Sequence, residues 1–413
     1  MSLQREGRRK APARRTWAGK DNGGDHLIDR SYFDEITDRR GTGAIKYEKP
    51  PAGDPEKVVP MWVADMDLKT APCVIEALEK TASQGIYGYT DWGDEYKEAV
   101  CGWYQRRMGW KVDPDWIIPV SGVIYGASVA IRALTEEGDG IIINQPVYHP
   151  FPNMVKNNGR KLLVSELVLK DGRYEIDFDD FEEKASEAKA FLFCSPHNPC
   201  GRVWRRDELE RIAAICQEND LYVISDEIHS DFVYSGSTHT PFASLSDEVS
   251  MRTVTCVSPT KTFNIAGIEA ANIIAEDKEI RRRISAECMR SGSIGQNLFG
   301  SAAVMAAYKG GDQWTDEMVA YLEGNAEEVK RFADNTPGIE LIHPEGTYLL
   351  WLDCRGLGMD GKTLQEFFLT RADVWLHDGS IFGAGGEGFL RMNIACPRKV
   401  LTEVLDMMHD AVV

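Results

Sequence analysis

The stretch of sequence that decides the fold is AFLFCSPHNPCG, at residues 190–201. Its first five residues are apolar and fit a strand that is buried on both faces, and the Pro, Asn and Gly residues that follow predict a tight turn. Two later stretches have the same layout: LYVISDEIHS at 221–230 and TVTCVSPTKTFN at 253–264. Buried strands that each end in a polar turn are typical of an α/β domain with a largely parallel sheet.

A helix is predicted between the first two of these strands. Its apolar residues fall on one helical face and are Leu209, Ile212, Ala213 and Cys216. Asp207 with Glu210 resembles a capping box at the start of this helix. The order of strand, helix and strand again favours a parallel sheet.

The same pattern extends over most of the chain. The seven predicted strands are 116–120, 140–144, 161–169, 190–194, 221–225, 253–258 and 270–275. After about residue 310 the pattern changes to a long polar helix (314–333), a strand (348–353), a helix near Leu364 and a strand that ends at Asn393. We expect a large domain at 71–310 with a seven-stranded sheet and a smaller α+β domain at 311–413. We also expect a segment at 25–70 that packs with the small domain, and a mobile basic arm at 1–24.

Composition excludes several classes of protein. The net charge of −18 argues against a nucleic-acid binder, which needs a concentrated positive surface. No apolar run approaches the ~20 residues that a membrane span needs, and the basic N-terminal residues lack the apolar core of a secretory signal. The nine cysteines are scattered and form no Cys-x-x-Cys pair, so we expect a reduced, soluble, cytoplasmic protein. The histidines at 149, 197, 229 and 239 form no i, i+4 pair, and we expect no metal.

Polar residues follow four of the predicted strands, at the sheet edge where parallel α/β proteins bind ligands. The small-residue turn SGVIYG at 121–126 offers free N–H groups that suit a phosphate, and Asn198 lies in the turn after 190–194. Asp226 is a carboxylate at the end of a buried strand and needs a cationic partner. Lys261 is crowded enough to act as a neutral nucleophile. The ordinary structural alternatives are turns, a helix cap and a solvated surface lysine.

Together, Asn-Pro-x-Gly, Ser-Asp-Glu-Ile-His and Ser-x-x-Lys in this order resemble the class I/II pyridoxal-phosphate aminotransferases, from about residue 58 to the C-terminus. The motifs at 61–67, 87–90, 195–199, 226–229 and 344–348 are similar to the MalY/PatB branch, whose known members are cystathionine β-lyases and related C–S lyases. The resemblance implies the aspartate aminotransferase-like fold and pyridoxal 5′-phosphate as the cofactor.

The resemblance also implies a role for each matching residue. Lys261 carries the cofactor as a Schiff base and removes the Cα proton. Asp226 pairs with the pyridine nitrogen, Asn198 bonds the ring oxygen and Tyr148 stacks on the ring. The remaining cofactor-binding residues are Gly122, Val123, Ile124 and Ser258 around the phosphate, His229, and Tyr89 from the second subunit of a homodimer. The substrate-binding residues are Arg391, which clamps the α-carboxylate, with Ala64, Tyr148 and Asn198.

Two differences from the usual aminotransferase pattern, and one motif that suggests a different cofactor, affect this interpretation. Gly267-Ile268-Glu269 replaces the usual Gly-x-Arg, so the phosphate charge must be balanced by backbone dipoles and Ser258. His229 replaces a tyrosine that many aminotransferases carry, which favours the lyase branch. GAGGEG at 383–388 fits a dinucleotide pattern, but a strand with Arg391 follows it instead of a helix, so we expect a loop that borders the substrate site.

The leading hypothesis is β-elimination from cystathionine or a related S-substituted cysteine, which gives a thiol, pyruvate and ammonia. Either Tyr148 or Lys261 is the candidate proton donor to the leaving thiolate. A true aminotransferase would use the same residues, and an additional regulatory role by protein contact is known for one member of this branch. The motifs do not choose the thioether, the pathway or any oligomer larger than a dimer.

Overall fold

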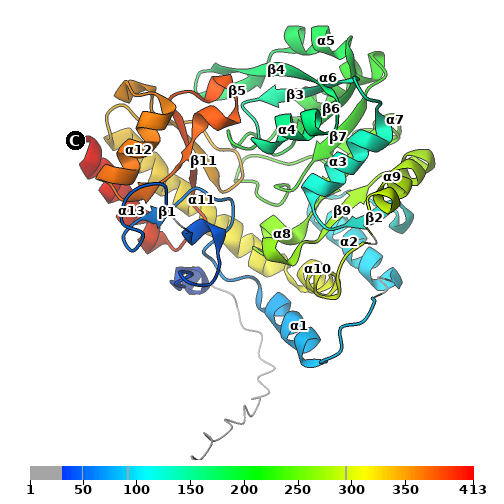
Figure 1. The fold of residues 1–413 in the computed structure, drawn as a ribbon, viewed down its shortest axis with the longest axis horizontal. Coiled ribbons are helices and arrows are strands. Elements are labelled where there is room, and N and C mark those ends of the chain that lie inside the picture. Colours follow the sequence, from blue (N-terminus) through cyan, green and yellow to red (C-terminus); the bar gives the residue numbers. More distant parts are fainter. Residues whose placement is uncertain (1–29, 49, 91–92, 294) are drawn as a thin grey trace, which may run out of the picture.

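The computed structural model describes residues 30–48, 50–90, 93–293 and 295–413 (Figure 1), so the predicted arm at 1–24 lies outside the described residues. Its central feature is an eight-stranded sheet in the order β2-β9-β8-β7-β6-β3-β4-β5. The strands in this order are Ile117–Val120, Ala271–Ile274, Thr253–Val257, Tyr222–Asp226, Ala188–Cys194, Gly140–Gln145, Lys161–Lys170 and Arg173–Ile176. The five strands from β8 to β4 are mutually parallel, whereas β9, β2 and β5 are antiparallel to their neighbours. The predicted α/β class with a mostly parallel sheet is confirmed.

Two local predictions differ from the structure. The sheet has eight strands instead of seven, because β5 is a short partner that a two-residue turn folds back onto β4. Both turn residues, Asp171 and Gly172, have positive φ (48° and 74°), as a tight hairpin turn requires. The capping box also lies two residues earlier than predicted: helix α6 (Arg206–Glu218) has Arg205 as its N-cap, and the Arg205 N–H donates to Glu208 Oε2 (2.8 Å).

The sheet is buried on both faces, as its continuous apolar strands predict. On β6, Leu192 and Cys194 face one apolar cluster, whereas Phe191 and Phe193 face the other. The first cluster is closed by α3 (Val123–Leu134), α4 (Pro150–Asn157) and α9 (Lys278–Arg290). The second is closed by α5 (Phe178–Ala185), α6 and α7 (Asp247–Ser250). Because apolar clusters cover both faces of the sheet, the polar groups that follow its parallel strands come together at the edge where those strands end.

The C-terminal part forms a smaller unit beside the sheet (Figure 1). Its antiparallel sheet has the order β10-β11-β14-β13. The strands are Glu340–Leu341, Leu349–Asp353, Phe389–Asn393 and His377–Asp378, and the helices are α11 (Asp312–Asn335), α12 (Gly361–Arg371) and α13 (Arg398–Val412). The helices and strands predicted after residue 310 are all present.

The N-terminal segment joins this smaller unit. Strand β1 (Val59–Pro60) pairs in parallel with β12 (Val374–Trp375). The chain then enters a group of helices under the large sheet: α1 (Pro72–Ser83), α2 (Gly93–Met108), α10 (Leu298–Gly310) and the short α8 (Pro259–Thr262). None of the helices in the described ranges is long and apolar enough to cross a membrane.

A buried ionic network fastens the smaller unit to the large sheet. Arg202 is fully buried and donates from Nε to Glu345 Oε2 (2.9 Å) and from Nη2 to Glu208 Oε2 (2.8 Å). Arg173 pairs with the other Glu345 oxygen at 2.6 Å, and the Val203 N–H also donates to Glu345. Burial alone would raise the pKa of the Glu345 carboxyl, but the Arg202 guanidinium and the Val203 N–H hold that pKa below its usual range. Glu345 is therefore ionised and locks the two units together.

We predict that Glu345→Gln lowers the free energy of unfolding by about 3 kcal/mol, because Arg202 then loses part of its counter-charge inside the protein. The pKa of Glu345 is lowered on folding, so its contribution is present above the unfolded pKa of ~4.3 and is lost as the pH falls through the folded value. Urea denaturation at pH 7.5 and at pH 4 measures both effects. Glu340→Gln, an exposed change on the neighbouring strand, is the control; equal losses in the two variants would contradict the role of Glu345.

Candidate active site

A cavity of about 510 Å³ opens at the carboxyl ends of β6 and β7, next to the first turn of α3. The described residues that line it are Ala64, Ser121, Gly122, Val123, Ile124, Tyr125, Ser128, Tyr148, Cys194, Asn198, Asp226, Ile228, His229, Thr260, Lys261, Ala266 and Glu269. Nine of the residues predicted as cofactor or substrate ligands are in this set. The structure thus brings together side chains that lie up to 197 residues apart along the chain.

One end of the cavity is suited to an anion. Gly122 is extended and Val123 begins the 12-residue helix α3, whose first N–H groups have no acceptor within the helix. Ser121, just before α3, and Ser128, within it, add hydroxyl groups to the lining. Glu269 is the acidic residue that stands in the predicted Gly-x-Arg position, and Lys261 is the only cation among the described lining residues. A phosphate here would be held mainly by helix N–H groups and hydroxyls.

Asp226 is a buried carboxylate without a cationic partner. It is 4% exposed, its Oδ1 accepts the Ile228 N–H (3.1 Å), and no Lys or Arg of the described residues lies within ion-pair distance. Burial raises the pKa of Asp226 to about 7, although the Ile228 N–H lowers it in part. Because Asp226 lines the cavity, a protonated nitrogen of a bound ligand is the partner that would keep it ionised.

Lys261 points into the same cavity from α8. Its Nζ donates to the Ala64 carbonyl at 2.5 Å. Burial lowers the pKa of Lys261 to about 8, with the charge of Asp65 acting in the opposite direction. A useful fraction of the amine is therefore neutral and nucleophilic near neutral pH.

Arg391 is in the middle of β14. It does not line the cavity itself but contacts Asn198, which does. Its Nη1 donates to Asn198 Oδ1 (3.1 Å) and its Nη2 to the Trp62 carbonyl (2.8 Å), with His377 Nδ1 at 3.0 Å. The guanidinium is 2% exposed and, among the described residues, has no carboxylate within ion-pair distance. Burial lowers the pKa of Arg391 to about 10, which still leaves it charged. A buried cation without a counter-charge suits a carboxylate ligand.

Aromatic and imidazole rings complete the wall. Burial raises the pKa of Tyr148, and the charge of Asp226 adds to this, so its hydroxyl is neutral. Burial and the charge of Lys261 lower the pKa of His229 to about 3, so its ring is neutral too. The His229 ring packs edge-on against Tyr348, with ring centroids 5.8 Å apart, and the Tyr348 hydroxyl donates to the Ala64 carbonyl at 3.0 Å.

Two predicted ligands lie away from the cavity. Ser258 caps α8, because its hydroxyl accepts the Thr260 N–H (3.0 Å) and donates to the Ala270 carbonyl (2.6 Å). Thr260 lines the cavity, but its hydroxyl lies 2.6 Å from Ser258 Oγ and donates to it, since the Ser258 hydroxyl donates to Ala270. No sequence pattern tells which of these two residues lines the cavity. Tyr89 is fully exposed in this chain. It lies just before residues 91–92, which are outside the described part of the chain.

The other sequence patterns do not build a second site. Gly383–Gly388 is followed by strand β14 and not by a helix, so the dinucleotide pattern has the wrong context. Within the described ranges, no group of three or more His, Cys, Asp or Glu residues is arranged to hold a metal ion. Sequence reasoning missed Tyr348 and His377, because both reach the site only through the C-terminal sheet.

Comparison with known proteins places the chain in a family. The model of the family described as "Aminotransferase class I and II" matches residues 56–408. The chain belongs to the aminotransferase class I and II family. It is 43% identical to cystathionine beta-lyase PatB of Bacillus subtilis (strain 168) over 385 residues, which cover 92% of this chain and 99% of that protein.

Two solved structures of class I and II aminotransferase fold are also similar. A pyridoxal-phosphate-bound putative aminotransferase from Clostridium difficile 630 has a TM-score of 0.90 and 40% identity, covering 92% of this chain and 99% of that one. Cystalysin from Treponema denticola, which contains pyridoxal 5′-phosphate, has a TM-score of 0.88 and 40% identity, covering 92% and 98%. These matches confirm the sequence resemblance and the aspartate aminotransferase-like fold.

The cavity fits pyridoxal 5′-phosphate, the cofactor of this aminotransferase family, on three independent grounds. Asp226 is a buried carboxylate that needs a protonated ring nitrogen. The first turn of α3 has N–H groups that need an anion. The Lys261 amine is partly neutral and faces the same space. One cofactor molecule meets all three requirements, with its ring nitrogen, its phosphate and its aldehyde.

We predict that Asp226→Asn stabilises the cofactor-free protein at pH 8 by on the order of 3 to 4 kcal/mol. The pKa of Asp226 is raised on folding, so wild-type stability is full below the unfolded pKa of ~3.9 and is lost as the pH rises through about 7. Urea denaturation of the two cofactor-free proteins between pH 4 and pH 8 measures this difference. A stability gap that does not change with pH would contradict the assignment.

Proposed function

We propose that this chain is a pyridoxal 5′-phosphate-dependent carbon–sulfur β-lyase. It eliminates the thiol from cystathionine or a related S-substituted L-cysteine and leaves pyruvate and ammonia. The observation that carries the proposal is that Lys261, whose amine is partly neutral, lines the same cavity as Asp226. Arg391, which has no carboxylate partner among the described residues, contacts the lining residue Asn198. The match to cystathionine beta-lyase PatB over nearly its whole length supports the choice of reaction.

The cofactor supplies an aldehyde that joins amino groups and a ring that draws electrons from Cα. Asp226 would hold the ring nitrogen in its protonated form, and Asn198 would bond the ring oxygen. Gly122, Val123 and Ile124 would hold the phosphate through the first turn of α3, with Ser121 and Ser128 as hydroxyl donors. Because these groups are fixed by strands and a helix, the reacting atoms are positioned before the substrate arrives.

The substrate is oriented by the other half of the site. Arg391 binds the α-carboxylate, and Asn198 and Tyr148 border the same position. Lys261, with its pKa near 8, takes the Cα proton as a general base. The carbon–sulfur bond then breaks, and the sulfur leaves with the bonding electron pair.

The thiolate needs a proton, and two groups near Cβ can donate one. Lys261 has just received a proton from Cα, and the neutral Tyr148 hydroxyl faces the same cavity. His229 also lines the cavity, but its ring is a poor proton donor to the thiolate, because burial and the charges of Lys261 and Arg391 lower the pKa of His229 to about 3. The overall balance is cystathionine plus water to homocysteine, pyruvate and ammonia.

We predict that the cofactor-loaded protein releases thiol and pyruvate from L-cystathionine in large molar excess over enzyme, without any keto acid. Lys261→Ala should abolish release, since removal of the base costs at least ~10²-fold in rate. Lys278→Ala, a lysine at the exposed start of α9, is the matched control and should retain full activity. Amino-group transfer that requires an added keto acid, with no thiol release, would make the chain an aminotransferase and refute the lyase assignment.

We propose further that two copies of the chain form a homodimer in which Tyr89 completes the partner's site. Tyr89, Ile86 and Tyr87 are large, exposed residues of one segment, a pattern that suits an interface. Tyr89 does not line the cavity of its own chain, which is also consistent with a role in the second subunit.

We predict that mixing Lys261→Ala with Tyr89→Ala protein restores activity to about one quarter of wild type, because half of randomly assorted dimers carry one intact site. Each variant alone should be much less active. The mixture is refolded together and assayed for pyruvate release, with sedimentation giving the oligomeric state. Activity equal to the simple average of the two variants would show that Tyr89 acts within its own chain or not at all.

We propose a cytoplasmic location, because all nine cysteines are free thiols and seven of them are buried. Alkylation of the protein in intact cells before lysis tests this, and a disulfide-linked product would contradict it.

A further inference from the structure

A short segment, Trp62–Asp67, contacts both key groups of the site through its backbone. We call it the strap. The Ala64 carbonyl accepts from Lys261 Nζ (2.5 Å), and the Trp62 carbonyl accepts from Arg391 Nη2 (2.8 Å). The base and the carboxylate-binding group are therefore both oriented by carbonyls that lie two residues apart on one loop.

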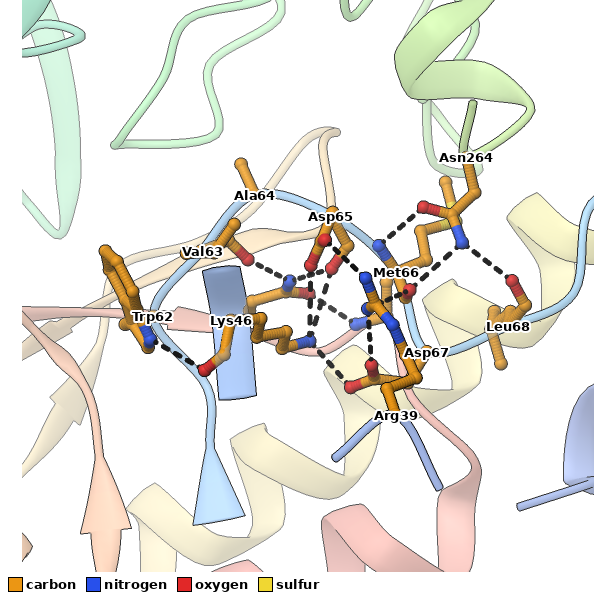
Figure 2. Close-up of polar contacts among 12 residues, drawn as sticks. Arg39, Lys46, Trp62, Val63, Ala64, Asp65, Met66, Asp67, Leu68 and Asn264 are labelled. Atoms are coloured by element: carbon orange, nitrogen blue, oxygen red, sulfur yellow. Dashed lines mark hydrogen bonds and ion pairs between the residues drawn. The ribbon is translucent and has the colours of Figure 1, made fainter. Parts of the chain in front are cut away.

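The far side of the strap is held by two cations from the N-terminal segment (Figure 2). Lys46 is fully buried, and its Nζ contacts Asp67 Oδ2 (2.7 Å) and the Asp65 carbonyl (3.2 Å). Arg39 bridges the two acids, with Nη1 at 2.9 Å from Asp67 Oδ1 and Nη2 at 2.8 Å from Asp65 Oδ2. Two cations balance two carboxylates, so this cluster needs no ligand to complete it.

Two asparagines hydrogen-bond the strap to the two structural units. Asn264, three residues after Lys261, accepts the Met66 N–H (2.9 Å) and donates to the Leu68 carbonyl (2.8 Å). Asn393, two residues after Arg391, donates to the Val63 carbonyl (2.5 Å) and to the Asp65 carbonyl (2.6 Å). Figure 2 shows Asn264 approaching the strap at the end opposite Trp62. The strap thus links the segment that carries Lys261 to the strand that carries Arg391.

We propose that Arg39 and Lys46 are positioning residues of the active site, which act through the strap on both Lys261 and Arg391. Their ion pairs with Asp65 and Asp67 fix the position of the strap in the protein. They thereby fix the positions of the Trp62 and Ala64 carbonyls. This role rests on the proposed function of Lys261 as base and Arg391 as carboxylate binder.

Burial makes the ion pairs strong determinants of the strap's position. Loss of either cation leaves an uncompensated carboxylate inside the protein, and that carboxylate must move toward water. Asp65 adjoins Ala64, so its movement displaces the carbonyl that orients Lys261 Nζ. The charge of Asp65 also acts on Lys261, whose pKa it raises against the effect of burial.

The geometry also explains why position 39 holds an arginine. The planar guanidinium reaches both carboxylates at once with separate N–H groups, whereas a lysine ammonium cannot span them in the same way. Arg39→Lys therefore keeps the positive charge and the fold but loses one of the two ion pairs, with Asp65 or with Asp67.

The test compares Arg39→Lys and Lys46→Met with matched controls of the same residue types. Arg40→Gln removes the neighbouring exposed arginine, and Lys69→Met removes a lysine in the exposed pair with Glu35. Each cofactor-loaded protein is assayed for kcat and KM with L-cystathionine. Propionate, a plain carboxylate that probes the Arg391 position, is titrated as a competitive inhibitor and through the visible absorbance of the bound cofactor.

We expect both strap variants to lose on the order of tenfold or more in kcat and to bind propionate and substrate several-fold more weakly, since a small misplacement of reacting groups costs up to ~10² in rate. The two controls should stay within about twofold of wild type. Normal kcat, KM and propionate affinity per loaded site, with only a lower thermal midpoint, would refute the proposal and leave a purely structural role.

Two further outcomes are separable. If Lys46→Met does not fold, Arg39→Lys decides the question with the same readouts. If wild-type protein releases no thiol, the lyase assignment fails, and unchanged propionate affinity in Arg39→Lys would then refute the strap role separately.

Discussion

The hydrogen bond from Lys261 Nζ to the Ala64 carbonyl is the contact on which the site depends, because it crosses from the large sheet to the strap. It holds a buried amine at the centre of the cavity while burial lowers the pKa of that amine to about 8. The same strap contacts Arg391, so the two functional groups share one support. The large sheet alone would position Asp226, but neither the Lys261 amine nor the carboxylate site.

The buried charges at Glu345, Asp67, Asp226 and Arg391 fall into two kinds, and the difference separates support from function. Around Glu345 and around Asp67, cations and carboxylates are paired at short distances and satisfy each other. Asp226 and Arg391 are just as buried but lack a counter-charge among the described residues. Since an unpaired buried charge is costly, these groups are the ones that a bound ligand stabilises.

The sequence was informative where function follows from strand ends and less so where it follows from tertiary packing. Asn198, Asp226 and Lys261 each come directly after an apolar run, and parallel strands bring such positions to one edge. Local periodicity carries no information on which of Ser258 and Thr260 turns inward, or on the depth of Arg391 behind Asn198. The same limit explains why β5 was missed: a four-residue strand is visible only through its pairing with β4.

The strap network was equally invisible in the sequence, since Arg39 and Asp65 are 26 residues apart and meet only through the tertiary fold. The turn before α3 has another kind of consequence. Its anion-binding groups belong to the main chain, which every residue except proline provides. Side chains at residues 122 and 124, which lie outside the apolar clusters, can therefore change during evolution while the affinity for an anion persists, and mutational robustness at these two positions exceeds that at Lys261 or Asp226.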